Sequence, residues 1–299
     1  MKKTRSKSVL ATLFLLLIWT APVAHAAPIP MWELEKPQGS AWILGSIHAM
    51  KSDMYPLPGV VTDKVLAVDS LVVEVNVLEL EAENYQRVVQ ETAFYQPGSD
   101  KTLLKDLESQ VAQLFENYLI RKQIPIQVFE QMKPWFVNIT IGMGEIMAKG
   151  YDPGLGVDLT LMKMARASGV AIVELESFGQ QMELLSADSL AIQNLSLKYT
   201  LENIDSIEKD LTELVEAWKK GDVEGMYKAG LNEMEKYPAL KDQFDRLIIR
   251  RNQAMAEKIE TLLVTGDDLM IVVGALHLGG EQGLLRLLGQ KYKITQLAN

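Results

Sequence analysis

Two apolar runs of strand length, near opposite ends of the chain, finish in the same short pattern. In the run Ala41–Ser46, Gly45 begins the sequence Gly-Ser-Ile-His that ends at His48, and in the run Met270–Gly274, Gly274 begins the sequence Gly-Ala-Leu-His that ends at His277. A third run, Leu71–Val75, is apolar except for a single carboxylate. Continuous apolar runs of this length are typical of strands buried on both faces in a parallel sheet. They predict an α/β protein with these strands at its centre.

The rest of the chain predicts how helices surround that sheet. Further strands are expected at Met31–Lys36, Val170–Glu176 and Tyr292–Leu297, and helices at Pro58–Val68, Glu79–Glu91, Asp158–Ala167 and Glu281–Leu288. Residues 102–150 have helical pieces cut by prolines, and about 179–263 has almost only helical periodicity. We therefore predict a single domain over 27–299, with a central, largely parallel or mixed sheet flanked by helices. A long helical insertion separates its N- and C-terminal strands.

The first 26 residues have the three parts of a secretory signal: a basic start, an apolar stretch at Val9–Ala21, and a small-residue site that ends at Ala26. We predict cleavage after Ala26. An uncleaved anchor is the alternative, but this apolar run is short against the roughly 20 residues of a spanning helix. The chain has no cysteine, which excludes disulfides and a lipoprotein anchor. A bacterial periplasm is the simplest destination.

The net charge of the chain excludes some classes of binding partner. The whole chain has a formal net charge of −9, and loss of the four basic residues in the signal takes it to −13. Nucleic-acid binding needs a basic footprint, which an acidic chain of this kind does not supply. No second stretch is apolar and long enough to span a membrane. We expect a peptide or small-molecule substrate, no nucleic acid, and no membrane contact after signal cleavage; the sequence specifies no oligomeric state.

Histidine is used sparingly in this chain. The third histidine, His25, lies in the predicted signal, so the mature chain has only His48 and His277, each just past the end of a predicted core strand. Ligands in open α/β sheets bind beyond the carboxyl ends of the strands, and imidazole is a common metal ligand and acid–base group. We interpret both histidines as site residues. The alternative is that each one hydrogen-bonds a loop carbonyl and fixes a turn.

Glu74 and Arg251 are further candidates. A carboxylate inside an apolar strand is costly unless it is paired or bound to a metal, although an edge position would also explain Glu74. With His48 and His277, Glu74 completes a ligand set suited to Mn, Zn or Fe. Arg251 sits in a predicted long helix. It is a solvated helix residue, a partner of Glu74, or a group that holds a substrate carboxylate or oxyanion.

Three other acidic residues are weaker candidates. Glu281 lies four residues after His277 and is a possible ligand or base, or simply a residue that favours a helix N-terminus. Asp158 is most simply a helix start. Glu176 ends its strand near the same sheet edge and is a candidate to support the site.

Several segments together resemble the TraB/PrgY/GumN family, which is related to the Tiki proteases and more distantly to erythromycin esterases and ChaN-like haem-binding proteins. The segments that carry the resemblance are Met31–Leu34, Leu44–His48, Leu71–Val75, Gly156–Asp158, Val173–Ser177 with Gln180 and Gln181, Arg251 with Asn252, and Val273–Leu284 followed by Lys291 and Tyr292.

The resemblance implies an α/β fold in which two Gly-x-x-His motifs, a Glu and an Arg converge on one site. These map onto His48, Glu74, Arg251 and His277. For Tiki-like members it implies metal-dependent proteolysis, with Mn or Co as the favoured ion. For plasmid-borne relatives it implies inhibition of a peptide pheromone.

Three functions compete at this stage. The first is a periplasmic metal-dependent peptidase, in which His48 and His277, with Glu74, hold the metal, Glu74 or Glu281 acts as general base, and Arg251 steadies the oxyanion. The second is a metal-free esterase-type hydrolase, in which His48 activates water and Glu74 orients it. The third is a binding protein that holds haem or recognises a peptide without cleaving it.

Overall fold

A computed structural model describes residues 28–298, except for the side chains of residues 28 and 232–236. The predicted signal, with His25 and the expected cleavage after Ala26, lies outside the described residues. Within the part described, no helix has both the length and the apolar character needed to cross a membrane.

The centre of the fold is a six-stranded mixed sheet with the strand order β4-β3-β5-β2-β1-β6. Strands β2, β3, β4 and β5 run parallel, whereas β1 is antiparallel to both of its neighbours, β2 and β6. The strands are β1 (Pro28–Glu35), β2 (Ala41–Ser46), β3 (Ser70–Val73), β4 (Ala171–Glu174), β5 (Leu269–Gly274) and β6 (Lys293–Ala298). The predicted mixed sheet is therefore confirmed.

The two strands that precede the histidines are neighbours in the middle of the sheet. Every residue of β2 and β5 is buried, in keeping with their continuous apolar sequence. Their register pairs Ser46 with Gly274, so the two Gly-x-x-His segments leave the sheet side by side. The edge strands β4 and β6 are more exposed.

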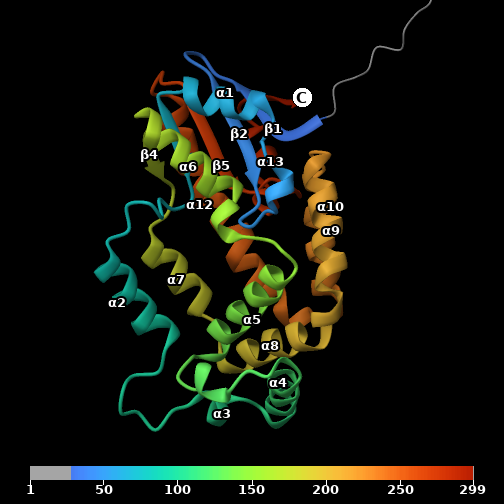
Figure 1. The fold of residues 1–299 in the computed structure, drawn as a ribbon. Coiled ribbons are helices and arrows are strands. Elements are labelled where there is room, and N and C mark those ends of the chain that lie inside the picture. Colours follow the sequence, from blue (N-terminus) through green and yellow to red (C-terminus); the bar gives the residue numbers. More distant parts are fainter. Residues whose placement is uncertain (1–27, 299) are drawn as a thin grey trace, which may run out of the picture.

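Chain direction decides which helices cover which face of the sheet. The steps from β2 to β3 and from β3 to β4 run toward the β4 edge, whereas the steps from β4 to β5 and from β5 to β6 run the other way. Right-handed crossovers then put the connecting helices on opposite faces. Helices α1 (Gly59–Ala67) and α6 (Val157–Ser168) cover one face, and α12 (Arg251–Leu263) and α13 (Leu284–Leu288) cover the other (Figure 1).

Most of the remaining helices form a second half of the molecule beyond the carboxyl ends of the parallel strands, whereas α9 (Ile207–Lys219) also reaches back to pack against β1 (Figure 1). The predicted long helical insertion is confirmed between β4 and β5, where it contains α7 (Phe178–Ser186), α8 (Leu190–Asn203), α9, α10 (Val223–Lys236) and α11 (Lys241–Phe244). A second segment, between β3 and β4, contributes α2 (Ala82–Ala93), α3 (Leu103–Asp106), α4 (Ser109–Lys122) and α5 (Pro134–Ala148). An apolar cluster that includes Phe115, Ile141 and Leu197 joins the two segments.

One helix is shorter than its sequence predicts, and the difference affects a candidate site residue. The helix expected at Glu281–Leu288 begins only at Leu284. Gly280 has a φ of 82° and Gly283 is extended, with φ −74° and ψ 154°, and an α-helix accommodates neither conformation. Glu281 therefore lies on a turn outside the helix.

Candidate functional site

The four parallel strands end at one edge of the sheet and bring four polar side chains to it. Glu74 directly follows β3, and Glu176 lies two residues past β4. His48 lies two residues past β2, and His277 lies three residues past β5. Arg251, the first residue of α12, reaches the same edge from the helical half. The structure thus places His48, Glu74, Arg251 and His277 together, with Glu176 as a fifth member.

Gly274 marks the point on which these groups converge. A Cβ atom built on Gly274 would lie 3.4 Å from Oε1 of Glu74, 3.5 Å from Nε2 of His48 and 3.6 Å from Cδ2 of His277. The glycine of the second Gly-x-x-His motif therefore keeps open the small space that the three side chains share.

His277 is buried, and its tautomer follows from its contacts. Its Nδ1 lies 2.6 Å from Oδ1 of Asn252, whose Nδ2 donates to the carbonyl of Gln282 at 2.8 Å. The amide oxygen can only accept, so Nδ1 of His277 carries the proton and Nε2 keeps its lone pair. Burial, aided by the charge of Arg251, lowers the pKa of His277 to about 4. The ring is therefore neutral at pH 7.

Arg251 is the electrostatic centre of the site, and all five of its N–H donors are engaged. Its Nε and Nη2 donate to Glu176 at 3.0 and 2.7 Å, and Nη2 also donates to Glu74. Its Nη1 donates to the carbonyl of Leu247 and to Nε2 of His277, both at 3.1 Å. No donor is left for a substrate oxyanion in this conformation. The geometry favours the expected pairing with Glu74 over the expected oxyanion contact.

Glu74 is an ionised acceptor rather than a base. Its Oε1 accepts the Gly274 N–H at 2.7 Å, and its Oε2 accepts from Arg251 and from Nε2 of Gln181, the latter at 3.3 Å. Burial alone would raise the pKa of Glu74. The neighbouring imidazoles, Arg251 and the Gly274 amide outweigh burial and lower that pKa to about 2.

His48 has the opposite character. Its Nδ1 lies 3.1 Å from Oδ2 of Asp158, and its side chain is 64% exposed. The hydrogen bond with Asp158, together with the negative charge of that carboxylate, raises the pKa of His48 above its ordinary value. The backbone N–H of Val157 donates to the carbonyl of Ile47 at 2.9 Å, which ties the start of α6 to the loop that carries His48. The site thus pairs a buried neutral imidazole with an exposed basic one.

Two residues that contact the site had no predicted role, and one residue that was predicted at the site lies outside it. Asn252 and Gln181 both touch the cluster, and their only sequence signal was their place in the family segments. Asp158, expected as a helix start, also orients His48. Glu281 is outside the cluster: its side chain is 82% exposed and pairs with Arg286 at 2.8 Å.

A divalent cation fits the chemistry of these donors. Both imidazoles are held at Nδ1 by a side-chain oxygen, which leaves Nε2 as the ligand atom, and Glu74 adds a carboxylate. In this conformation the three side chains are not arranged to hold a cation, because Nη1 of Arg251 donates a hydrogen bond to Nε2 of His277, the atom that would bind the metal. Accordingly, among the described residues no group of three or more His, Asp or Glu side chains is arranged to hold a metal ion. A cation would need this one Arg251 contact to give way.

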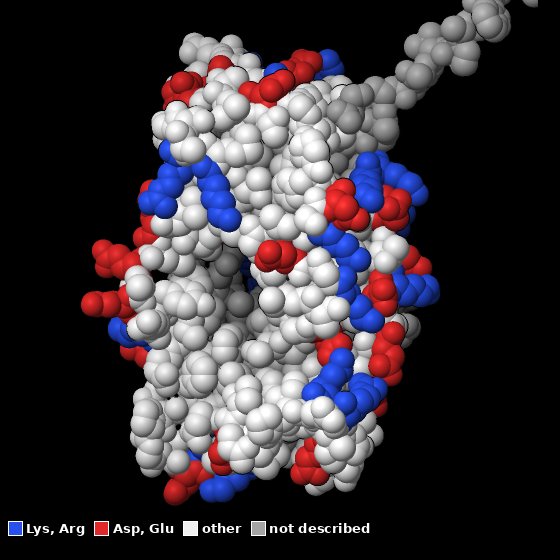
Figure 2. Space-filling model, in the orientation of Figure 1, with Lys and Arg blue, Asp and Glu red and all other residues white. Residues whose placement is uncertain are grey.

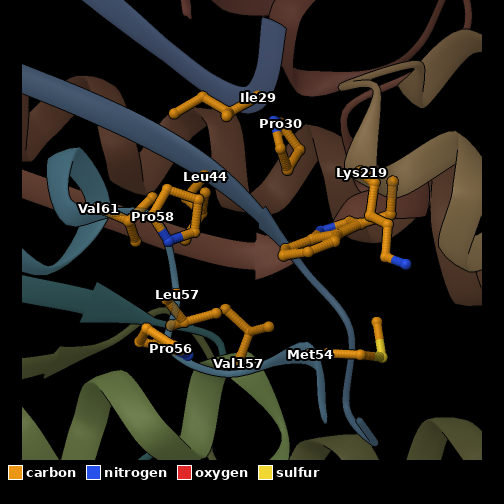
Figure 3. Close-up of a pocket in the computed structure, with 11 residues that line it drawn as sticks. Ile29, Pro30, Leu44, Met54, Pro56, Leu57, Pro58, Val61, Val157 and Lys219 are labelled. Carbon is orange, nitrogen blue, oxygen red and sulfur yellow. The ribbon is translucent and has the colours of Figure 1, made fainter. Parts of the chain in front are cut away.

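Open space reaches the site from the helical half. Figure 2 shows a deep hollow in one face of the molecule, between its sheet half and its helical half. Glu176 and Arg251 also line a cavity of about 540 Å³ between α7 and α12. A separate cavity of about 250 Å³ is lined mainly by apolar side chains, with Leu44, Val157 and Trp218 in its wall (Figure 3). The indole of Trp218 donates to the carbonyl of Gly45 at 2.8 Å, so this second cavity lies behind the first Gly-x-x-His motif.

The fold and the site together define a mixed α/β protein with two histidines, a glutamate and an arginine at the carboxyl ends of its parallel strands. The model of the TraB/PrgY/gumN family matches residues 30–296, and the chain belongs to that family. The chain is also similar to "Uncharacterized protein YbaP" of Escherichia coli (strain K12), with 23% identity over 249 residues, or 82% of this chain and 86% of that protein. The protein of the same name from Shigella flexneri matches to the same extent. No solved structure matches the chain.

Proposed function

We propose that this chain is an exported hydrolase of the bacterial periplasm that cleaves peptides with the help of a divalent cation, with Mn or Co favoured. His48, His277 and Glu74 would hold the cation. One observation supports this choice above the others: Nδ1 of each histidine is fixed by another side chain, Asp158 or Asn252. Metal-binding histidines use such partners to set their tautomer and orientation.

The bound cation would supply a water acidic enough to act as a nucleophile near pH 7. The chain supplies the rest. Asn252 keeps the lone pair of His277 directed at the site, and Asp158 does the same for His48. Arg251 keeps Glu74 ionised and ready to act as a ligand. Glu281 has no part in this scheme, because it points to solvent.

A metal-free hydrolase is the second candidate, and a specific contact favours it. Arg251 already satisfies Nε2 of His277, so His277 has no unmet need for a cation. In this scheme the exposed His48 activates a water, and Asp158 orients it through Nδ1. Asp158 thus takes the orienting role that the sequence suggested for Glu74.

The deciding experiment measures metal content and peptide cleavage on the same preparation. The purified protein is loaded with Mn, Co or Zn, desalted and analysed by elemental analysis, and a peptide library is then followed by mass spectrometry with and without EDTA. Near-stoichiometric metal, together with cleavage that EDTA abolishes and Mn restores, supports the metal-dependent hydrolase. Cleavage that survives EDTA selects the metal-free scheme. If the loaded protein cleaves no peptide and no ester, both schemes are wrong.

A further inference from the structure

A small cavity with aromatic walls lies next to the site, between α2 and the start of α7. Its volume is about 370 Å³, and it is lined by Val77, Leu80, Ala82, Tyr85, Gln86 and Phe178. Val77 lies three residues after Glu74, and Phe178 lies two residues after Glu176. The N–H of Asn76 donates to Oε1 of Glu174 at 2.6 Å, which joins the segment after β3 to the end of β4. Two of the segments that line the cavity therefore start at the same sheet edge as the site.

The walls of this cavity present aromatic surface to solvent. Tyr85 and Phe178 are stacked, with ring centroids 5.1 Å apart and an interplanar angle of 27°. Tyr85 is nevertheless 47% exposed, and Val77 is 46% exposed. A planar guanidinium stacks well on such a surface, and its aliphatic stem suits apolar neighbours.

Three exposed carboxylates lie on the segment that carries most of these lining residues. Glu79, Glu81 and Glu83 alternate along the chain with lining residues, and all three are exposed. Among the described residues none of the three has an ion-pair partner. The cation on α2, Arg87, is engaged by Glu91 at 3.0 Å. Figure 2 shows acidic side chains projecting at the left edge of the molecule, over α2, with a basic side chain below them.

We propose that this cavity is a substrate subsite for an arginine side chain of an extended peptide. Tyr85 and Phe178 would stack against the guanidinium, and the carboxylates of Glu81 and Glu83 would neutralise it. The inference rests on the proposed hydrolase function, because it makes the cavity the place where the peptide is selected beside the reacting groups. It also specifies the substrate class as basic peptides.

The test compares two peptides that differ in charge alone. A fluorescein-labelled nonapeptide of alanine and glycine with one central arginine is titrated by anisotropy at low ionic strength, beside the same peptide with citrulline in place of arginine. Citrulline keeps the shape of arginine but removes its charge. We expect the arginine peptide to bind about tenfold more tightly. Equal Kd values for the two peptides would overturn the subsite.

Two variants locate the effect. Glu81→Gln/Glu83→Gln and Tyr85→Ala should each remove most of the arginine preference, since one removes the charge and the other removes the stacking face. The matched control, Asp63→Asn/Glu116→Gln, deletes two exposed carboxylates elsewhere and should keep the preference. Circular dichroism checks that each variant is folded. A preference that persists unchanged in both cavity variants would also refute the assignment.

Cleavage of the same peptides, followed by mass spectrometry, separates the two proposals. Arginine-selective binding without any cleavage, with or without Mn, would refute the hydrolase and leave the subsite in place. Cleavage with no preference for arginine over citrulline would support the hydrolase and refute the subsite.

Discussion

The side-chain oxygen of Asn252 accepts a hydrogen bond from Nδ1 of His277 over 2.6 Å, and both side chains are buried. The other end of the Asn252 amide donates to a backbone carbonyl, so the amide cannot turn over without losing both bonds. This one contact fixes the protonated nitrogen of His277 and therefore the direction of its free lone pair.

Replacing Asn252 by alanine should loosen His277 more than it perturbs the fold. We expect activity to fall by about 10- to 100-fold and the free energy of unfolding to fall by about 1–3 kcal/mol, because a buried donor loses its partner. Nitrogen NMR of labelled histidine should show the Nδ1–H tautomer in the wild type and a mixture in the variant. Gln253→Ala, an exposed neighbour, is the control. An unchanged tautomer in Asn252→Ala would refute the role given to Asn252.

The Gly274→Ala variant tests whether the space beside that glycine is the reacting centre. The new Cβ would lie at ordinary contact distance, 3.4–3.6 Å, from the nearest atoms of Glu74, His48 and His277. The fold should therefore survive, with a melting temperature close to that of the wild type, whereas metal loading and hydrolysis should be lost. Full activity in Gly274→Ala would place the chemistry elsewhere.

The other glycine of the pair predicts the opposite result. A Cβ on Gly45 would lie 3.0 Å from Leu278 and 3.1 Å from Ala275, both buried. Overpacking of this kind typically costs about 1–3 kcal/mol. Gly45→Ala should thus lower the urea midpoint. A wild-type midpoint for Gly45→Ala would show that the two motifs do not differ in this way.

The Asp158→Asn variant should change the pH dependence of the reaction. Asp158 raises the pKa of His48, and either scheme for the reaction needs Nε2 of His48 deprotonated. The acid limb of kcat/KM should therefore move to lower pH in Asp158→Asn, while the plateau falls because the ring is held less firmly. Asp152→Asn serves as the control, since the Asp152 side chain accepts the N–H of Gly154 and caps a turn. A limb that stays in place would exclude His48 as the titrating group.

Arg251 should contribute more to the free energy of unfolding than any other charged residue of the site. Arg251→Met would leave Glu74 and Glu176 as buried carboxylates without their counter-charge, which typically costs about 3–5 kcal/mol. The double variant Arg251→Met/Glu176→Gln removes one of these two charges and should recover part of the loss. Urea unfolding measures both. If the two variants were equally stable, the stabilising link between Arg251 and Glu176 would be disproved.

The metal-free protein should lose stability between about pH 6.5 and pH 4. The pKa of His277 is about 4 in the fold and about 6.5 in the unfolded chain, so only the unfolded chain takes up a proton in this window. Stability is full above pH 6.5 and falls by about 1.4 kcal/mol per pH unit, to a total near 3 kcal/mol.

The other groups of the site whose pKa values are shifted add little to the change in stability between pH 6.5 and pH 4. Glu74, with its pKa lowered to about 2, loses its contribution only below the unfolded value near 4. The pKa of His48 is raised, so its contribution is fully present below pH 6.5 and is lost only at higher pH. Chemical denaturation in EDTA across this range, compared with His277→Gln, isolates the slope, which should be absent from the variant.

Much of the fold followed from the sequence because its signals are local. The apolar runs of β2 and β5 predicted buried parallel strands, and each Gly-x-x-His placed a histidine at a strand end. Helical periodicity likewise predicted the insertion after β4. The contribution of residues 82–148 to the same helical half was not predictable, because it depends on contacts between α5 and α8 that local patterns do not encode.

The sequence by itself determined the types of group that meet at this site: two imidazoles just past the ends of two core strands, and a carboxylate on a third strand. Only the tertiary structure decided their states. Burial and the contact with Asn252 make His277 neutral, whereas an exposed contact with Asp158 makes His48 basic. All five N–H donors of Arg251 are hydrogen-bonded to neighbouring groups. Protonation and pairing depend on desolvation and on distances of a few ångströms between residues far apart in the chain, and both arise only when the strands are brought together.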